Sequence, residues 1–173
     1  MLIHERSVTK EYWSATYDYI HRRLDNGRYA KVQGTGVVHV QGGENTTTFA
    51  VLHGGSPVAW LNLAKRPSWK AWEVRQVWVF PEVRGQGLAG KIYRAAVNER
   101  QLILASGKTQ SKSSRALWLS FVKKNTFRIW AQDFNNLDLR SPVWVEDNEI
   151  QSRLEIYTRF TTSRDVRLIA IRK

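Results

Sequence analysis

Cysteine is absent from this sequence of 173 residues, and acidic residues are few. Without cysteine, the chain can form neither disulfides nor thiolate metal sites, and it has no cysteine nucleophile. No apolar run approaches the roughly 20 residues that a membrane-spanning helix requires. The first ten residues, MLIHERSVTK, also lack the hydrophobic region of a secretory signal. We therefore expect a cytoplasmic protein that does not span a membrane.

The shortage of acidic residues leaves the chain strongly basic, because 27 Lys and Arg against 15 Asp and Glu give a formal net charge of +12. Such a surface attracts polyanions: a phosphorylated cofactor, an acidic protein partner or nucleic acid. The basic residues are scattered and form no block of like charges. A solvated basic surface or a phosphate-binding rim is therefore favoured over a nucleic-acid partner.

Hydrophobic spacing predicts one mixed α/β domain over residues 1–173. Trp13, Tyr17, Ile20 and Leu24 recur on one face of a helix expected at 9–24. β-Branched and aromatic stretches then predict an antiparallel meander, with strands at 36–40, 46–52, 58–64 and 71–80. A helix, a strand, a helix and a strand follow at 88–100, 102–105, 113–125 and 127–131, and further strands are expected at 141–147, 154–160 and 166–173. The middle of the chain therefore predicts a βαβ unit with parallel strands.

Residues 85–90, GQGLAG, match the G-x-G-x-x-G pattern of dinucleotide-binding folds. That assignment requires the first glycine directly after a strand and an acidic residue about 20 residues further on. Here PEVR intervenes at 81–84, and LILASGKTQ at 102–110 contains no acid. The SGKT run within it is no P-loop either, because Leu102 stands where the first glycine is required. The glycines therefore bind another phosphate or only form a tight turn.

A second frame of the same residues, RGQGLA at 84–89, fits R/Q-x-x-G-x-G/A between a strand and an amphipathic helix. It resembles the acyl-CoA loop of the GNAT N-acetyltransferase superfamily. Glycines let several main-chain N–H groups turn inward in front of a helix N-terminus, so a pyrophosphate can bind without a side chain. The order of the expected elements is also similar over most of the chain. The resemblance implies a GNAT-like fold and acetyl-CoA, or another acyl-CoA, as co-substrate.

By this resemblance, the cofactor would contact the strand before the loop, the loop itself and the later helix. The implied residues are Val77, Trp78, Val79, Arg84, Gly85, Gln86, Gly87, Leu88, Ala89, Gly90 and Ser113. Pantetheine would pair with the backbone of Val77 to Val79, and an N–H group near Val79 would stabilise the thioester oxyanion. The acyl group would pass directly to an unidentified amine or protein acceptor, in a ternary complex.

Two residues are candidates for the proton transfers. Glu73, expected on the same strand face as Arg75 and Val77, could act as the base, or it could simply pair with Arg75. The family pattern N-x-x-A-x-x-x-Y-x-x-x-G-F is only partly present at 113–127, since Ala116 matches but Ser113 stands where Asn is usual. Phe121 occupies the place nearest to the usual Tyr acid. Ser120 could relay the proton, or could only solvate its helix.

The missing Tyr leaves an alternative open: a catalytically silent module that binds CoA or a partner protein, such as a host enzyme, and modulates it. The run GKTQSKSSRALW at 107–118 resembles small acetyltransferase-like proteins encoded by phages, which would place this protein in the host cytoplasm. No metal site is expected, because the four histidines are far apart and lack ligand spacing. Trp69, among Lys65, Arg66 and Lys70, is a candidate for an exposed aromatic at an acceptor or base-stacking surface.

Overall fold

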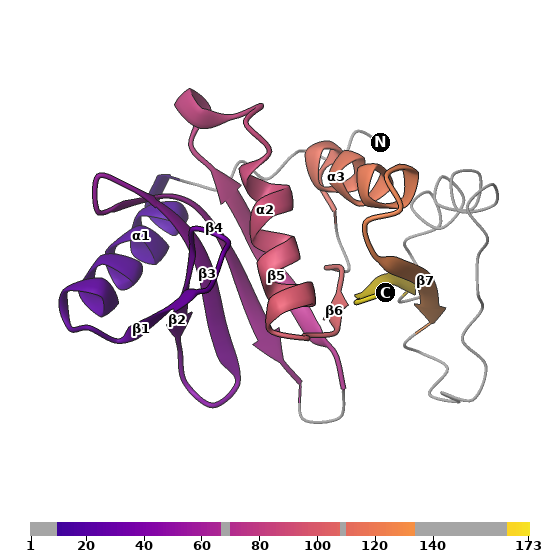
Figure 1. Ribbon diagram of the computed structural model, residues 1–173, viewed down its shortest axis with the longest axis horizontal. Helices are drawn as coiled ribbons and strands as arrows, with labels where there is room; N and C mark the ends of the chain where they lie inside the picture. Colours follow the sequence, from indigo (N-terminus) through magenta and orange to yellow (C-terminus); the bar gives the residue numbers. More distant parts are fainter. Residues whose placement is uncertain (1–9, 67–69, 108–109, 134–165) are drawn as a thin grey trace.

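The computed structural model describes residues 10–66, 70–107, 110–133 and 166–173 (Figure 1). Its helices and strands, in chain order, are α1 Lys10–Asp25, β1 Tyr29–Val32, β2 Val37–Gln41, β3 Thr46–His53, β4 Ser56–Lys65, β5 Trp72–Val79, α2 Leu88–Arg94, β6 Leu104–Ala105, α3 Lys112–Lys123, β7 Arg128–Asp133 and β8 Val166–Ile171. A 3-10 turn, Pro81–Val83, precedes α2, and a π-helical turn, Ala95–Glu99, follows it.

The strands form an eight-stranded mixed sheet in the order β1-β2-β3-β4-β5-β6-β8-β7. All neighbours are antiparallel except β5 and β6, which are joined through α2 and pair in parallel. The expected mixed α/β fold, with an antiparallel meander before a βαβ crossover, is confirmed. The order at the far edge differs from a simple βαβ series, because β8 lies between β6 and β7 and is antiparallel to both.

The two faces of the sheet carry different helices because side chains alternate along each strand. Val37, Phe49 and Leu61 pack with α2 and α3, whereas Val38 and Trp60 pack with α1. Figure 1 shows α2 crossing the middle of the sheet, with α3 beside it toward β6 and β7. We refer below to the α1 face and the α2 face of the sheet.

Three features differ from the sequence expectations or fall outside them. β1 was not predicted, because its short sequence YAKV is mostly exposed and has no apolar alternation. The helix expected at 88–100 changes to π-helical geometry after Arg94. The strands expected at 141–147 and 154–160 lie outside the described residues, whereas the last one is present as β8.

A bulge in β5 decides which residues share a face. Asn62 of β4 is opposite Gln76, but the next residue, Leu63, is opposite Val74, so Arg75 is an extra residue without a partner. Val74 and Val77 consequently both pack on the α2 face. The expectation that Glu73 shares a face with Val77 is wrong, because strict alternation from Glu73 does not hold across an inserted residue.

Candidate active site

The loop between β5 and α2 has the backbone conformation that its glycines allow. Gly85 and Gly87 have φ angles of +80° and +74°, in the left-handed region. A Cβ atom at either position would meet no atom of the described part of the chain within 4 Å. These glycines are therefore required by the backbone conformation and not by crowding, because other residues adopt this region only with strain. The loop residues Arg84 to Gly87 are all exposed.

The start of α2 is open toward this loop. Gly87 is the N-cap residue and offers no side-chain acceptor, and the first helical hydrogen bond runs from the Lys91 N–H to the Gly87 carbonyl at 3.0 Å. The N–H groups of Leu88, Ala89 and Gly90 come before that bond, where a helix has no internal acceptor. They can bind an anion, which the helix dipole also favours.

Arg84 fastens the loop to the end of β5. Its Nε donates to the Val79 carbonyl at 3.1 Å, and its guanidinium carbon lies 5.8 Å from the centre of the Trp78 ring. Both contacts direct the Arg84 side chain toward β5, although the residue is exposed. The positive charge that the sequence places at the loop entrance is therefore fixed in position.

Among the strands that the structure describes, none pairs with one edge of β5 over most of its length. β6 pairs with β5 only at Trp72 and Glu73, so the strand beyond them has no β6 neighbour. On the other side, the Phe80 N–H, just after β5, donates to the Val58 carbonyl of β4. Because backbone groups alternate in direction along a strand, those of Val77 and Val79 point away from β4. A peptide-like ligand could therefore pair with Val77 and Val79 along this open edge.

The side chains of these cofactor candidates divide between the two faces. Val77 and Val79 pack against the core under α2, and Leu88 joins them there. Trp78 points to the α1 face, where its ring stacks with Trp13 and Trp60, each at 6.3 Å between centroids. The contribution of Trp78 to a bound cofactor would therefore come from its backbone.

Glu73, the candidate base, is held by three arginine side chains. Its carboxylate lies 3.0 Å from Arg66 Nε, 3.2 Å from Arg75 Nη1 and 2.7 Å from Arg167 Nη1. Burial alone would raise the pKa of Glu73, but the hydrogen bond and charge of Arg167, with the charges of Arg75 and Arg66, outweigh it and lower the pKa. A carboxylate stabilised in this way is a weak proton acceptor. The pairing with Arg75 that the sequence suggested is present.

The serine candidates occupy ordinary helix positions. The Ser120 hydroxyl donates to the Leu117 carbonyl at 2.7 Å, within α3. Ser111 is the N-cap of α3, since its hydroxyl accepts from the Ser114 N–H at 3.1 Å. Ser113 lies exposed in the first turn, with no capping role.

Phe121, next to Ser120 at the pattern's Tyr position, is buried in an aromatic cluster. Its ring centroid lies 5.1 Å from Tyr93, 6.1 Å from Trp118 and 5.0 Å from Phe127. Tyr93 is fully buried, and this burial raises its pKa despite the opposing effect of Trp118. Neither aromatic residue therefore offers an exposed proton donor in place of the missing Tyr.

A buried polar network on the α1 face was not predicted from the sequence. The Gln76 amide oxygen accepts from Trp60 Nε1 at 3.1 Å, from Asn62 Nδ2 at 3.2 Å and from the Thr16 hydroxyl at 3.3 Å. The Asn62 oxygen in turn accepts from Thr48 at 2.7 Å. Gln76 is only 7% exposed, and its amide nitrogen has no hydrogen-bond partner among the residues that the structure describes. The one available signal was a glutamine at the centre of an apolar strand.

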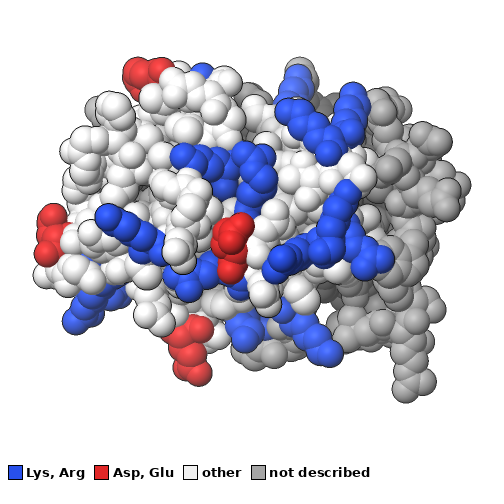
Figure 2. Space-filling view, viewed as in Figure 1, with Lys and Arg blue, Asp and Glu red and all other residues white. Residues whose placement is uncertain are grey.

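The surface around this site is basic. Figure 2 shows Lys and Arg side chains spread over the face that carries α2 and α3, with few acidic residues among them. Arg94, Lys112 and Lys123 are exposed basic residues of these two helices. Within the described ranges, no group of three His, Asp or Glu residues could hold a metal ion, and no helix is long and apolar enough to cross a membrane. Trp69 lies outside the described residues.

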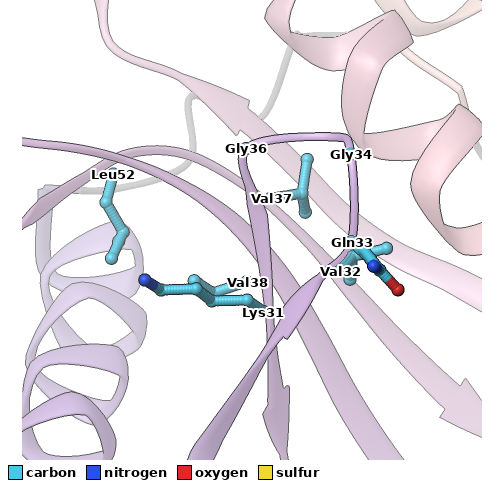
Figure 3. Close-up of a pocket in the computed structure, with 8 residues that line it drawn as sticks. All are labelled: Lys31, Val32, Gln33, Gly34, Gly36, Val37, Val38 and Leu52. Atoms are coloured by element: carbon cyan, nitrogen blue, oxygen red, sulfur yellow. The ribbon is translucent and has the colours of Figure 1, made fainter.

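A hollow of about 650 Å³ lies away from the loop, at the β1–β2 hairpin (Figure 3). It is lined by Lys31, Val32, Gln33, Gly34, Gly36, Val37, Val38 and Leu52. None of these residues belongs to β5 or to the loop before α2. The hollow is mostly apolar and brings together no pair of groups suited to acid–base chemistry.

Comparison with known proteins gives a family match and several solved structures. Residues 7–101, more than half of the chain, match the sequence model of the acetyltransferase (GNAT) family. An IAA acetyltransferase from Bacillus cereus ATCC 14579 is 20% identical, with a TM-score of 0.41, over 74% of this chain and 78% of that one. A GNAT family acetyltransferase from Elizabethkingia anophelis, solved with acetyl-CoA bound, is 18% identical, with a TM-score of 0.39, over 75% and 77%. No curated protein sequence matches the chain.

Proposed function

Because the chain belongs to the GNAT acetyltransferase family, we propose that it is an acyl-CoA-dependent N-acyltransferase, which transfers an acetyl group from acetyl-CoA directly to an amine. The observation that carries this proposal is the junction of β5 and α2. There, two left-handed glycines and an uncapped helix start adjoin a strand edge that no other described strand pairs with. An anionic diphosphate fits the first feature, and a peptide-like pantetheine arm fits the second.

Different residues of the junction would bind different parts of acetyl-CoA. The N–H groups from Gln86 to Gly90 would hold the diphosphate, and Arg84 would keep the loop in place through its bond to the Val79 carbonyl. Because that carbonyl already has a donor, Val79 would offer its N–H group and Val77 both of its backbone groups. Ser113, exposed at the start of α3, would contribute a hydroxyl at the rim.

Acetyl-CoA supplies an acyl group activated as a thioester when it is bound. The N–H of Val79, at the open edge, would stabilise negative charge on the thioester oxygen as the amine attacks. In this transfer the carbon–sulfur bond breaks and a carbon–nitrogen bond forms, the amine loses one proton and the departing thiolate gains one. Glu73 and Ser120 remain the candidates for these proton transfers. Their contacts with three arginines and with the Leu117 carbonyl favour structural roles, with water exchanging the protons.

Two measurements test this proposal together. Titration calorimetry with acetyl-CoA should give saturable heat, and acetyl-CoA at 100 times its dissociation constant should add about 2.7 kcal/mol to the free energy of unfolding. A thiol-release assay over amines, polyamines, amino acids and peptides should then identify an acceptor. Calorimetry without heat would contradict the cofactor site, and binding without turnover on any acceptor would contradict the enzymatic activity alone.

A catalytically silent module remains the second candidate function, and one specific observation favours it. Glu73, Ser120 and Phe121, at the positions considered for acid–base chemistry, are respectively ion-paired, hydrogen-bonded within a helix and buried. Such a protein would bind CoA and modulate a partner, for which its basic surface fits an acidic protein. If the protein is such a module, Glu73→Gln and Ser120→Ala should leave the partner's response unchanged. Loss of that response in Glu73→Gln, with binding to the partner retained, would exclude this function.

The remaining expectations from the sequence stay predictions. They are the cytoplasmic location, the phage-encoded branch with its host cytoplasm, the single domain over residues 1–173 and the weak preference against nucleic acid. The described residues bear directly on none of them.

A further inference from the structure

The outer edge of β1 has no neighbour among the strands that the structure describes. β1 comes first in the sheet order, and of these strands only β2 pairs with it. Tyr29, Ala30 and Lys31 are exposed, and Tyr29, at 40%, is the only large hydrophobic residue exposed in the described ranges. Backbone groups alternate in direction along a strand, so two of the four β1 residues direct an N–H and a C=O away from β2. Such an edge can pair with a further strand.

A basic hollow of about 410 Å³ lies at the first end of β1. Its lining includes Arg23, Arg28, Tyr29, His39 and Gln41, and none of its lining residues is acidic. The end of α1 leads the chain back to this place, because Gly27, with a φ angle of +64°, lets the Arg28 N–H donate to the Arg23 carbonyl at 2.8 Å. Two guanidinium groups in one polar hollow fit a carboxylate, which they can bind through charge-assisted hydrogen bonds.

The apolar hollow of about 650 Å³ lies at the other end of β1, at the turn to β2. Val32, Val37, Val38 and Leu52 supply most of its apolar lining, and Figure 3 shows Lys31 extending from β1 toward Leu52. Because a strand advances about 3.3 Å per residue, the four residues of β1 separate the two hollows by roughly 10 Å. One extended segment along β1 could therefore reach both hollows.

The charges beside this edge indicate which kind of segment it fits. Residues 22–31 contain four basic residues, Arg22, Arg23, Arg28 and Lys31, and one acid, Asp25. Pairing of β1 with a second copy of itself would bring two such sets of like charges together, which is unfavourable across a strand pair. A segment that carries carboxylates would be attracted instead. Nucleic acid would match the charges but not the edge, because its backbone lacks the alternating N–H and C=O groups of a strand.

We propose that β1 is a docking edge for a partner protein, which adds an extended acidic segment to the sheet as a further strand. The segment pairs with the backbone of β1, places a carboxylate in the basic hollow at Arg23 and Arg28, and places an apolar side chain in the hollow at Val37 and Leu52. This interaction is independent of acyl transfer, because neither hollow is lined by a residue of β5 or of the loop before α2.

Synthetic peptides test the docking edge. The probe is a fluorescein-labelled peptide of three glutamates, two threonines and three valines in that order, so that one end is acidic and the other apolar. Fluorescence anisotropy should show saturable binding, and hydrogen exchange at the amides of residues 29–32 should slow when the peptide is bound. A peptide with lysines for the glutamates should bind about tenfold more weakly or not at all. So should a peptide with prolines for the two threonines, because proline has no N–H to pair with an edge.

Charge variants assign the binding to β1. Arg28→Glu combined with Lys31→Glu reverses two exposed charges at this edge and should weaken binding of the acidic peptide by about tenfold or more, since each reversal replaces an attraction by a repulsion. Arg172→Glu is the matched control, because it reverses an exposed charge just after β8, toward the opposite end of the sheet. The proline peptide and the exchange measurement use the wild-type chain, so they decide the matter if the double variant fails to fold.

Several outcomes would overturn the inference. No saturable binding of the acidic peptide below about 1 mM would exclude the docking edge. Equal binding of the proline peptide, or no slower exchange at residues 29–32, would show that only the net charge attracts the peptide. A dimer detected by light scattering, with these amides protected in the free protein, would assign the edge to a second copy. Displacement of the peptide by a thymidine oligonucleotide that binds more tightly, and that the double variant no longer binds, would assign it to nucleic acid.

Discussion

At the scale of single residues, the loop glycines and Glu73 differ in how far their sequence context reveals them. Gly85 and Gly87 are recognisable because a strand, a basic residue and an amphipathic helix surround them, and their left-handed φ angles agree with the expected curled loop. Glu73 could be recognised as a polar residue in an apolar strand, but not as one held by three arginines. Arg167, its buried partner, is distant in the chain and reaches Glu73 only because β8 lies beside β6.

Gly85→Ala should weaken acetyl-CoA binding. Alanine at a φ of +80° costs about 1 kcal/mol or more in strain, which would be relieved by flattening the loop that holds the diphosphate. Gly54→Ala is the matched control, since Gly54 also has a positive φ and open space but lies in the β3–β4 turn. Both variants should lower the melting temperature, while calorimetry should find reduced affinity only in Gly85→Ala. Equal affinities would speak against a role for the loop.

Glu73→Gln should be mainly a stability variant. Removing the charge from a buried ion pair costs about 3 kcal/mol, and chemical denaturation measures this against Glu82→Gln, which changes an exposed acid. Because the folded-state pKa of Glu73 is lowered, its stabilisation is present above its ordinary value of 4.5 and is lost as the pH falls through the lower folded value. The free energy of unfolding should therefore fall less steeply in acid for the variant than for the wild type.

The same variant separates the two roles considered for Glu73. A structural role in the ion pairs with Arg66, Arg75 and Arg167 predicts that kcat and its pH profile stay unchanged in the folded variant. A general base contributes about a hundredfold or more to the rate. A loss of that size in kcat, in a variant that remains folded, would assign Glu73 to catalysis.

At the scale of elements, α3 combines a cap that the structure identifies with a cofactor position that the family resemblance implies. Ser111→Ala removes the N-cap hydroxyl bond to the Ser114 N–H and should cost about 1 kcal/mol. Ser113→Ala, two residues further on, should leave stability unchanged and weaken acetyl-CoA binding. Urea denaturation and calorimetry on both variants provide the comparison. If Ser113→Ala binds acetyl-CoA as the wild type does, Ser113 is not part of the site.

Most elements follow from local patterns, and those that do not have clear reasons. α1, α2 and α3 and the strands β2 to β5 follow the apolar periodicities of 3.6 and 2 residues. β1 lies at the sheet edge and is mostly exposed, so its sequence YAKV does not need alternating apolar and polar residues. The bulge at Arg75 has no local signal, because it arises from the match in register between β5 and β4.

At the scale of the whole molecule, the net charge of +12 should act on any phosphorylated ligand. The affinity for CoA should fall as sodium chloride is raised from about 0.05 to 0.5 M, because screening shortens the Debye length from above to below about 10 Å. Pantetheine, which lacks the phosphates, is the control and should show little salt dependence. Equal salt dependence for both ligands, measured by calorimetry, would show that the basic surface does not contribute to binding.

The sequence by itself determined the mixed α/β class, the strand–loop–helix junction at 84–90 and the family, since each depends on neighbouring residues and on backbone preferences that act locally. The tertiary structure decided which side chains meet. The amide of Gln76 is oriented by residues 14, 16 and 60 positions away, and the open edge of β5 exists because β6 pairs over only two residues. Contacts of this kind depend on strand register and on the insertion of β8, which no local pattern encodes.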